Sequence, residues 1–334
     1  MLVLGIESTC DETACAIVRD GREILANVVS SQIDLHTTYG GVVPELACRR
    51  HIDVILPVIQ EALTQAQIPL NAIDLLAVAH GPGLIGALLI GINAAKGLSI
   101  ALQKPFVGVN HIEAHLYAAL MSHPSPVEFP CLGVVLSGGH TSLVRLDGLG
   151  RYTNISETVD DAIGEAFDKV AKILDLPYPG GPEIERMALQ GDPSRYALRA
   201  GKVKGKPLHF SFSGLKTAVL YAFQGKELTP ADKCDLAASF QQAALQDVLD
   251  KTLRAAQEHA CKALIFGGGV TNNKRLRALF AAKAADLLQL WPAEGLVLDN
   301  AAMIAGLGYH VFLQRGGDSL HLEAATRIAF GGLC

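Results

Sequence analysis

Two histidines four residues apart, His111 and His115, have the spacing in this chain that most directly suggests chemistry. Residues four apart on a helix share a face, so both imidazoles would point in one direction. Asp299 lies at the end of a later apolar run, which we expect to form a strand. Two histidines and an aspartate leave coordination positions open and suit iron, zinc or manganese. The same spacing also occurs in histidine pairs that only pack in a core or lie on a surface.

The histidine pair also invites a metalloprotease interpretation, which the position of the glutamate disfavours. Zinc proteases place the catalytic glutamate directly after the first histidine, in the pattern H-E-x-x-H. Here the sequence is H-I-E-A-H, and Glu113 is displaced by about 200° from His111 around a helix. We therefore expect Glu113 to point away from the face that carries the two histidines.

Three turns have the residue types that bind anions through backbone N–H groups. They span residues 8–13, 137–141 and 267–273, and none matches the P-loop pattern or the G-x-G-x-x-G fingerprint. Each alone is more typical of a plain tight turn, and the three together make nucleotide binding and plain tight turns equally good interpretations. The first turn also carries Asp11 and Glu12, which could orient an amine, accept a proton, or simply be solvated.

The elements that would position these residues alternate between strands and helices. Helices are expected from about 44 to 67, from 84 and from 111, with a loop at 34–44. A unit of strand, small-residue turn and strand occurs twice, which indicates an internal repeat. Such an alternation indicates an α/β architecture, in which ligands bind at the carboxyl ends of strands. The expected strands are 2–6, 13–18, 24–29, 75–79, 106–109, 132–136, 141–146 and 263–266.

The composition limits the remaining classes of protein. Of 334 residues, 50% are hydrophobic and 18% are charged, enough apolar material for about two domains. The apolar stretch 75–102 is interrupted by polar residues, so we expect a strand, loop and helix and no membrane span. Residues 1–7 lack the basic segment of a secretory signal peptide. Seven cysteines without a C-x-x-C pair indicate a reducing, cytoplasmic compartment and no disulfide framework.

One segment is strongly basic although the chain has a net charge of −5. Between Pro193 and Lys226 there are seven lysines and arginines and no acidic residue. Such a concentration suits contacts to nucleic-acid phosphates, and the interleaved Tyr196, His209 and Phe210 suit stacking on an exposed base. A solvated basic loop is the alternative. The basic residues are Arg195, Arg199, Lys202, Lys204, Lys206, Lys216 and Lys226.

Eight motifs in this order resemble the TsaD/Kae family, the tRNA N6-adenosine threonylcarbamoyltransferases formerly called O-sialoglycoprotein endopeptidases. The likeness covers almost the whole chain. Two positions depart from the pattern, Asn110 in place of a histidine and Leu298 in place of a threonine, and neither is a ligand. The motifs lie at 7–14 (ESTCDETA), 39–45 (YGGVVPE), 111–115 (HIEAH), 137–141 (SGGHT), 164–169 (GEAFDK), 178–182 (YPGGP), 210–217 (FSFSGLKT) and 299–305 (DNAAMIA).

The resemblance implies a reaction and a set of site residues. Threonylcarbamoyl-AMP would donate its threonylcarbamoyl group to N6 of adenosine 37 in tRNAs that read codons beginning with A. Asp11 and Glu12 would be active-site acids. One divalent metal ion, iron in the bacterial family with zinc or manganese as alternatives, would be bound by His111, His115 and Asp299. The adenylate would be held by Val135, Leu136, Ser137, Gly138, Gly139, Asp168, Gly181 and Asn273. The charge of the basic segment, and not the resemblance, suggests that tRNA is bound by Arg195, Arg199, Lys202, Lys204 and Lys206.

The resemblance also implies the fold and the partners. We expect a two-lobed actin-like and Hsp70-like (ASKHA) fold with duplicated ribonuclease H-like subdomains, and nucleotide and metal between the lobes. The N-terminal lobe would span 1–128, completed by the C-terminal helix from about 300 to 334, and the second lobe 129–299. Expected partners are tRNA, a TsaB-like paralogue, a TsaE-like ATPase and a TsaC/Sua-type synthase that makes the adenylate. The alternatives are a kinase or ATPase of the same superfamily, and a catalytically silent partner in an assembly.

Overall fold

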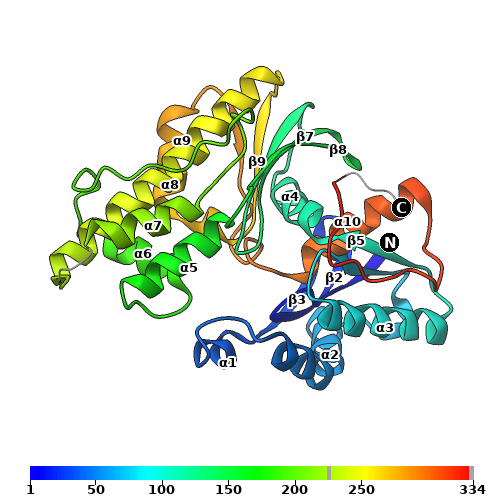
Figure 1. The fold of residues 1–334 in the computed structure, drawn as a ribbon. Coiled ribbons are helices and arrows are strands. Elements are labelled where there is room, and N and C mark those ends of the chain that lie inside the picture. Colours follow the sequence, from blue (N-terminus) through cyan, green and yellow to red (C-terminus); the bar gives the residue numbers. More distant parts are fainter. Residues whose placement is uncertain (224–226, 331–334) are drawn as a thin grey trace. The chain divides into compact units, whose positions relative to one another are not determined.

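The computed structural model describes residues 1–223 and 227–330, which divide into two units. Unit 1 consists of Met1–Pro126 with Pro292–Cys334, and unit 2 of Val127–Trp291. Each unit contains one five-stranded mixed sheet with helices packed against it (Figure 1). The sequence-based expectation of an α/β architecture is therefore correct.

The sheet of unit 1 has the strand order β3-β2-β1-β4-β5. The first three strands form two antiparallel hairpins, whereas β4 and β5 run parallel to β1. Because the parallel strands end at the same edge, the turns after β1, β4 and β5 all lie there. The strands are β1 (Leu2–Glu7), β2 (Glu12–Arg19), β3 (Glu23–Ser31), β4 (Leu75–Gly81) and β5 (Phe106–Asn110).

Helices cover both faces of this sheet. The helices α2 and α3 lie together along one side (Figure 1), and their Val58, Leu88 and Ile92 belong to one buried cluster with apolar residues of β1, β2 and β4. The helix α10 packs against β1, and a side chain at Gly5 would collide with the Ala301 carbonyl oxygen at 2.4 Å. The helices of unit 1 are α1 (Ile33–Thr37), α2 (Pro44–Ala66), the 3₁₀ turn η1 (Leu70–Ala72), α3 (Ile85–Leu102), α4 (His111–Met121) and α10 (Ala301–Arg315).

Unit 2 repeats the same strand order. Its sheet runs β8-β7-β6-β9-β10, with two antiparallel hairpins at one end and parallel pairs at the other. The predicted internal repeat is thus confirmed, because β6 and β7 occupy the positions that β1 and β2 hold in unit 1. The strands are β6 (Cys131–Leu136), β7 (Thr141–Gly148), β8 (Arg151–Glu157), β9 (Ala263–Gly267) and β10 (Leu288–Leu290).

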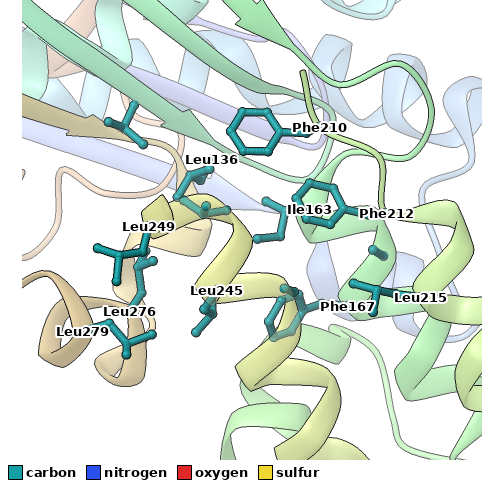
Figure 2. Close-up of a cluster of buried hydrophobic side chains, with 14 of the residues drawn as sticks. Leu136, Ile163, Phe167, Phe210, Phe212, Leu215, Leu245, Leu249, Leu276 and Leu279 are labelled. Carbon is teal, nitrogen blue, oxygen red and sulfur yellow. The ribbon is translucent and has the colours of Figure 1, made fainter. Parts of the chain in front are cut away.

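The core of unit 2 lies between this sheet and its helices. Figure 2 shows Phe167, Phe210 and Phe212 among leucines that come from β6 and from helices α7, α8 and α9. Burying an aromatic or leucine side chain contributes about 1.5–3 kcal/mol, so this cluster dominates the stability of the unit. The helices are α5 (Ile163–Ile173), α6 (Gly180–Ala188), α7 (Ser213–Ala222), α8 (Pro230–Glu258), the 3₁₀ turn η2 (Gly269–Asn272) and α9 (Lys274–Lys283).

Two details of unit 1 differ from or refine the expectations. The segment 34–44, expected as a loop, contains the short helix α1. The helix α3 is the one helix among the described residues that is long and apolar enough to cross a membrane by length and composition. In the structure Ala87, Leu88 and Ile92 of α3 are buried in the core of unit 1, and 28% of the helix is buried.

A carboxylate in unit 2 joins the loop after β8 to residues 211–213 within the basic segment. Asp160 accepts hydrogen bonds from the backbone N–H groups of Phe212 and Ser213 and from the hydroxyls of Ser211 and Ser213, at 2.6–3.2 Å. Nearby, the Gly201 N–H donates to the Ser211 carbonyl at 3.0 Å. These bonds close residues 201–211 into a loop with a fixed base.

Replacing Asp160 by asparagine should lower the free energy of unfolding of unit 2 by about 1 kcal/mol near pH 7. Partial burial opposes ionisation, but the four hydrogen bonds lower the pKa of Asp160 below its ordinary value of 3.8. A lowered pKa stabilises the fold above the unfolded value, and this stabilisation is lost as the pH falls through the folded value. Denaturant unfolding at several pH values should therefore show the difference shrinking below about pH 4. Asp147→Asn, at a surface ion pair with Arg145, is the control and should change little.

Candidate metal centre

The helix α4 begins directly at the end of β5 and carries both histidines of the predicted site. Its first turn is capped by Asn110, whose Oδ1 accepts hydrogen bonds from the N–H groups of Ile112 and Glu113. Asparagine is among the best residues at this position, so the departure from the family pattern at Asn110 has a structural role. His111 and His115 then lie one turn apart, with ring centroids at 4.6 Å.

The structure brings Asp299 to these two histidines. Its Oδ1 lies 3.0 Å from His115 Nε2 and 3.6 Å from His111 Nε2. Donor atoms of the three residues all lie within 4.8 Å of one another, an arrangement that could hold one metal ion. Both histidines are buried, and the His115 Nδ1 atom has no hydrogen-bond partner in the part of the chain that the structure describes. The predicted grouping of these residues is therefore present.

The expected strand before Asp299 is absent. Residues 291–300 form an irregular loop, and the nearest strand is β10 at Leu288–Leu290. Asp299 is instead placed by the start of α10, where the Asn300 side chain caps the helix by accepting from the Met303 N–H at 3.1 Å. Leu296 and Val297 of this stretch are buried without forming a strand, and Leu298 is 56% exposed.

A buried carboxylate orients His111. Glu7, at the end of β1, is 0% exposed, and its Oε2 lies 2.8 Å from His111 Nδ1. Its other oxygen accepts the Thr9 N–H at 2.6 Å. A carboxylate bonded to Nδ1 keeps the imidazole proton on that nitrogen. The lone pair of Nε2, on the side of Asp299, is then available to bind a metal ion. The sequence motif contained Glu7, but its contact with His111 could not be predicted from spacing.

The charges around the centre favour a bound cation. Burial alone would lower the pKa of His111, but the Glu7 and Asp299 carboxylates raise it to about 9. A raised pKa means that the surroundings stabilise positive charge at this position. Two imidazoles and a carboxylate with an oriented Nε2 fit iron, zinc or manganese, and a metal ion would take the place of the proton.

The acidic turn, defined here as Cys10–Thr13, lies beside this centre. Thr9, just before it, has its hydroxyl 3.4 Å from His111 Nδ1. Burial, together with the Asp299 and Asp11 carboxylates, raises the pKa of Glu12 to about 9, although the Ser31 hydroxyl bonds its Oε1 at 3.1 Å. Without a bound cation, Glu12 therefore keeps a proton at neutral pH.

The residues predicted to hold an adenylate lie on four segments of unit 2. The turn Ser137–His140 closes through a Ser137 N–H to His140 carbonyl bond at 2.8 Å, and a side chain at Gly138 or Gly139 would meet open space. The helix α5 packs closely against this turn at Gly164. A side chain at that position would lie 2.7 Å from the Ser137 carbonyl oxygen, so glycine permits the close approach. The preceding residues Val135 and Leu136 are buried in β6.

The helix α5 also carries Asp168, which holds the start of α6. Asp168 Oδ1 accepts the Gly180 N–H at 2.7 Å, so the structure brings Asp168 next to Gly181. Burial raises the pKa of Asp168, and the N–H groups of Gly180 and Gly181 offset part of this effect. A surface ion pair between Asp168 and Lys172, which their i, i+4 spacing would allow, is not among the ion pairs of the described residues.

A cavity of about 640 Å³ in unit 2 is lined by residues that directly follow two of the predicted positions. Its walls include Pro182 and Glu185 of α6, which follow Gly181, and Lys274, which follows Asn273. The Asn273 side chain caps α9 and donates to Gln241 Oε1 of α8 at 2.8 Å. Sequence reasoning missed Glu185 and Gln241 because no motif marks them, and only the packing of α6 against α8 makes them a wall.

Comparison with known proteins decides the family. The family model described as TsaD, tRNA N6-adenosine threonylcarbamoyltransferase, matches residues 23–306. A tRNA N6-adenosine threonylcarbamoyltransferase of Protochlamydia amoebophila (strain UWE25) is 63% identical over 335 residues, covering 98% of both chains. The chain belongs to the TsaD family. It is therefore a tRNA N6-adenosine threonylcarbamoyltransferase, as the sequence motifs predicted, and the kinase and endopeptidase alternatives are set aside.

Solved structures agree with the ASKHA fold expected for a TsaD-family member. Component A of (R)-2-hydroxyglutaryl-CoA dehydratase from Acidaminococcus fermentans aligns with a TM-score of 0.54 at 16% identity, covering 93% of this chain and 98% of that one. Full-length HypF aligns with a TM-score of 0.64 at 12% identity, covering 95% of this chain and 56% of that one. At these identities the likeness concerns the fold.

The basic segment of this TsaD-family chain is only partly as expected. Lys202, Lys204 and Lys206 are exposed on the loop that Asp160 and Gly201 fix, whereas Lys226 lies outside the described residues. The expectation that Phe210 stacks on a base is wrong, because its ring is 0% exposed and stacks on Phe212 at 5.8 Å. Alternation of aromatic and basic residues therefore did not indicate a nucleic-acid surface at that position.

We expect Glu7→Gln to weaken metal binding by about 10- to 100-fold, because an amide no longer fixes the proton on His111 Nδ1. Competition with a chromogenic chelator, after loading with Fe²⁺ under anaerobic conditions or with Zn²⁺, would measure the affinity. Glu23→Gln, at a surface ion pair with Arg19 in the same unit, is the matched control and should bind metal like the parent chain. Equal affinities in the parent and in Glu7→Gln would show that Glu7 does not orient His111.

Proposed function

We propose that this chain transfers the threonylcarbamoyl group from threonylcarbamoyl-AMP to N6 of adenosine 37 in tRNAs that read codons beginning with A. The observation that carries this proposal is the set of the buried His111 and His115 with the half-buried Asp299, beside the acidic turn, in a chain of the TsaD family. The donor is a mixed anhydride. In the transfer, a bond forms between N6 and the carbamoyl carbon, the bond to the phosphate oxygen breaks, and AMP leaves.

The two histidines and Asp299 would hold one divalent metal ion, which we propose to be Fe²⁺, with zinc and manganese as alternatives. When bound, such an ion polarises a carbonyl and neutralises a leaving phosphate. Neighbouring residues of the chain position these ligands. Glu7 keeps Nε2 of His111 available, and the cap at Asn300 keeps Asp299 at the start of α10.

Asp11 and Glu12 are proposed to have different roles in proton transfer. N6 of adenine is a poor nucleophile because its lone pair is delocalised, so a carboxylate that takes its proton assists bond formation. Two neighbouring acids do not readily ionise together, and burial favours the protonated form of Glu12. We therefore assign Asp11 as the acceptor of the N6 proton and Glu12 as its hydrogen-bonded partner.

In unit 2, the proposed adenylate site consists of the 135–139 turn with Asp168, Gly181 and Asn273. Support comes from the open space at Gly138 and Gly139, where backbone N–H groups could approach a phosphate. The 640 Å³ cavity beside Gly181 and Asn273 is large enough for a nucleoside. A TsaB-like paralogue, a TsaE-like ATPase and a TsaC/Sua-type synthase are proposed partners, and the proposed location is the cytoplasm.

The transfer itself can be tested with radiolabelled threonine, bicarbonate, ATP, a TsaC/Sua-type synthase, the TsaB-like and TsaE-like partners and unmodified tRNA. Label should reach tRNA with the parent chain. His111→Ala, His115→Ala and Asp299→Ala should each reduce transfer more than about 100-fold and lower the metal content, because each removes a ligand. Glu113→Gln, on the same helix, should transfer normally.

Two results would count against this assignment. Label that never reaches tRNA with the parent chain would contradict the proposed reaction. Full transfer together with full metal content in any one triad variant would remove that residue from the ligand set. Loss of transfer in Glu113→Gln would instead favour a role for this glutamate that its place on the helix does not suggest.

We propose that tRNA docks on the loop closed by Asp160 and Gly201, through Lys202, Lys204 and Lys206, with Arg195 and Arg199 nearby in the sequence. All five side chains belong to exposed residues. The ion pairs of the described residues involve none of them, so their charge is available for phosphates. The fixed base of the loop reduces the entropy lost on binding.

Reversing Lys202, Lys204 and Lys206 to glutamate should weaken tRNA binding at least about tenfold at low salt. It should also reduce the slope of log affinity against log salt by about 2–3, while metal binding stays unchanged. Filter binding over a range of salt concentrations would measure both. The control reverses Lys172, Lys262 and Lys283, which are also exposed in unit 2 and change the net charge equally. Similar losses in both triple variants would place the docking surface elsewhere.

A further inference from the structure

A buried histidine outside the metal centre forms hydrogen bonds to both ends of the acidic turn. His51, on α2, is 0% exposed. Its Nε2 lies 2.9 Å from the Cys10 carbonyl oxygen, and its Nδ1 lies 2.7 Å from the Thr13 hydroxyl oxygen. One ring therefore contacts the residue before Asp11 and the residue after Glu12.

The two partners define the state of this ring. A carbonyl oxygen only accepts hydrogen bonds, so Nε2 of His51 carries a proton. Burial lowers the pKa of His51, although the Cys10 carbonyl and nearby carboxylates oppose this effect, so the ring is neutral at pH 7. In the neutral ring Nδ1 is an acceptor, and the Thr13 hydroxyl donates to it.

The contact with the Cys10 carbonyl fixes the direction of a whole peptide group. The Cys10–Asp11 peptide is trans, so its C=O and N–H point in opposite directions. Holding the carbonyl toward α2 therefore turns the Asp11 N–H away from α2. The same backbone orientation sets the direction of the Asp11 side chain.

The other side of the turn is held from β3 and from the residue after it. The Gln32 N–H donates to the Asp11 carbonyl at 3.1 Å, and the Ser31 hydroxyl bonds Glu12 Oε1. The orientation of the acidic turn thus depends on contacts at all four of its residues, two of them made by His51. No other side chain of the described residues contacts both ends of the turn through hydrogen bonds.

We propose that His51 is a positioning residue for the transfer reaction. It fixes the Cys10–Thr13 turn so that Asp11 and Glu12 keep the orientation that proton transfer from N6 requires. This inference rests on the proposed function, because it presupposes the role given to the two acids. His51 makes no hydrogen bond to His111, His115 or Asp299, so its effect on the rate would come through the turn.

Two substitutions separate the two contacts of the ring. In His51→Gln the amide nitrogen can take the place of Nε2 and still donate to the Cys10 carbonyl. In His51→Asn the amide oxygen can take the place of Nδ1, but the Cys10 carbonyl loses its donor. We expect single-turnover transfer to fall less than about tenfold in His51→Gln and about 100-fold in His51→Asn, the scale of a misplaced catalytic group. KM for tRNA and the metal content should stay within about threefold of the parent values.

A double variant tests whether His51 acts through Asp11. If it does, His51→Asn should cause little further loss in a chain that already carries Asp11→Asn, because the group it positions is gone. His310→Gln is the matched control. His310 is also a histidine of unit 1 bonded to a hydroxyl, that of Tyr117 at 2.8 Å, but it lies on α10 away from the acidic turn. This control should transfer normally.

Several outcomes would overturn the inference. Normal transfer by His51→Asn would do so, as would equal losses in His51→Asn and His51→Gln, or fully additive losses with Asp11→Asn. If His51→Asn does not fold, Thr13→Val and Thr13→Ser replace it, with a loss of about tenfold expected in the valine variant alone. Normal transfer by Asp11→Asn and by Glu12→Gln would instead contradict the proposed role of the two acids. The result for those variants does not depend on His51, so failure of the proposed function can be distinguished from failure of this inference.

Discussion

The chemistry of unit 1 depends on the burial of one carboxylate, that of Glu7. A carboxylate with no solvent contact is stable only when its oxygens are fully hydrogen-bonded or paired with charge. Glu7 meets this condition with the Thr9 N–H and with His111, two partners on different segments. The turn after β1 and the first turn of α4 are thereby held together. Moving either segment would leave a buried charge without a partner, which makes the arrangement rigid.

The parallel strands make this contact possible. Because β1, β4 and β5 run side by side in one direction, the segments that follow them emerge at one edge. The segment after β4 adds two further bonds, since the Leu84 N–H donates to the Thr9 carbonyl and the Ser8 hydroxyl donates to the Ala87 carbonyl. A negative cluster is thus assembled at this edge. Burial first, and then this cluster, raises the pKa of Glu12, and the cluster raises the pKa of His111 against the effect of burial.

Local patterns allowed much of this unit to be predicted, and long-range contacts set the limit. The spacing of His111 and His115 indicated a shared face because helical periodicity is a local property. The repeated strand–turn–strand unit likewise indicated two related sheets. In contrast, the role of Glu7 depends on a partner 104 residues away, and that of His51 on a partner 41 residues away. Asp299 was expected after a strand because apolar runs resemble strands, whereas the cap at Asn300 determines its position.

The duplication of the sheet also shows how one backbone plan supports two kinds of chemistry. The hairpin β1–β2 and the hairpin β6–β7 hold equivalent places in sheets of the same strand order. The first turn carries Asp11 and Glu12, and hydrogen bonds hold each of the four residues of the acidic turn. The second carries Gly138 and Gly139, where no atom lies within reach of an added side chain. Carboxylates repel phosphate, and glycines admit it to the backbone N–H groups. The side chains of the two turns, more than their backbone plan, therefore support the proposed proton transfer in unit 1 and the proposed anion binding in unit 2.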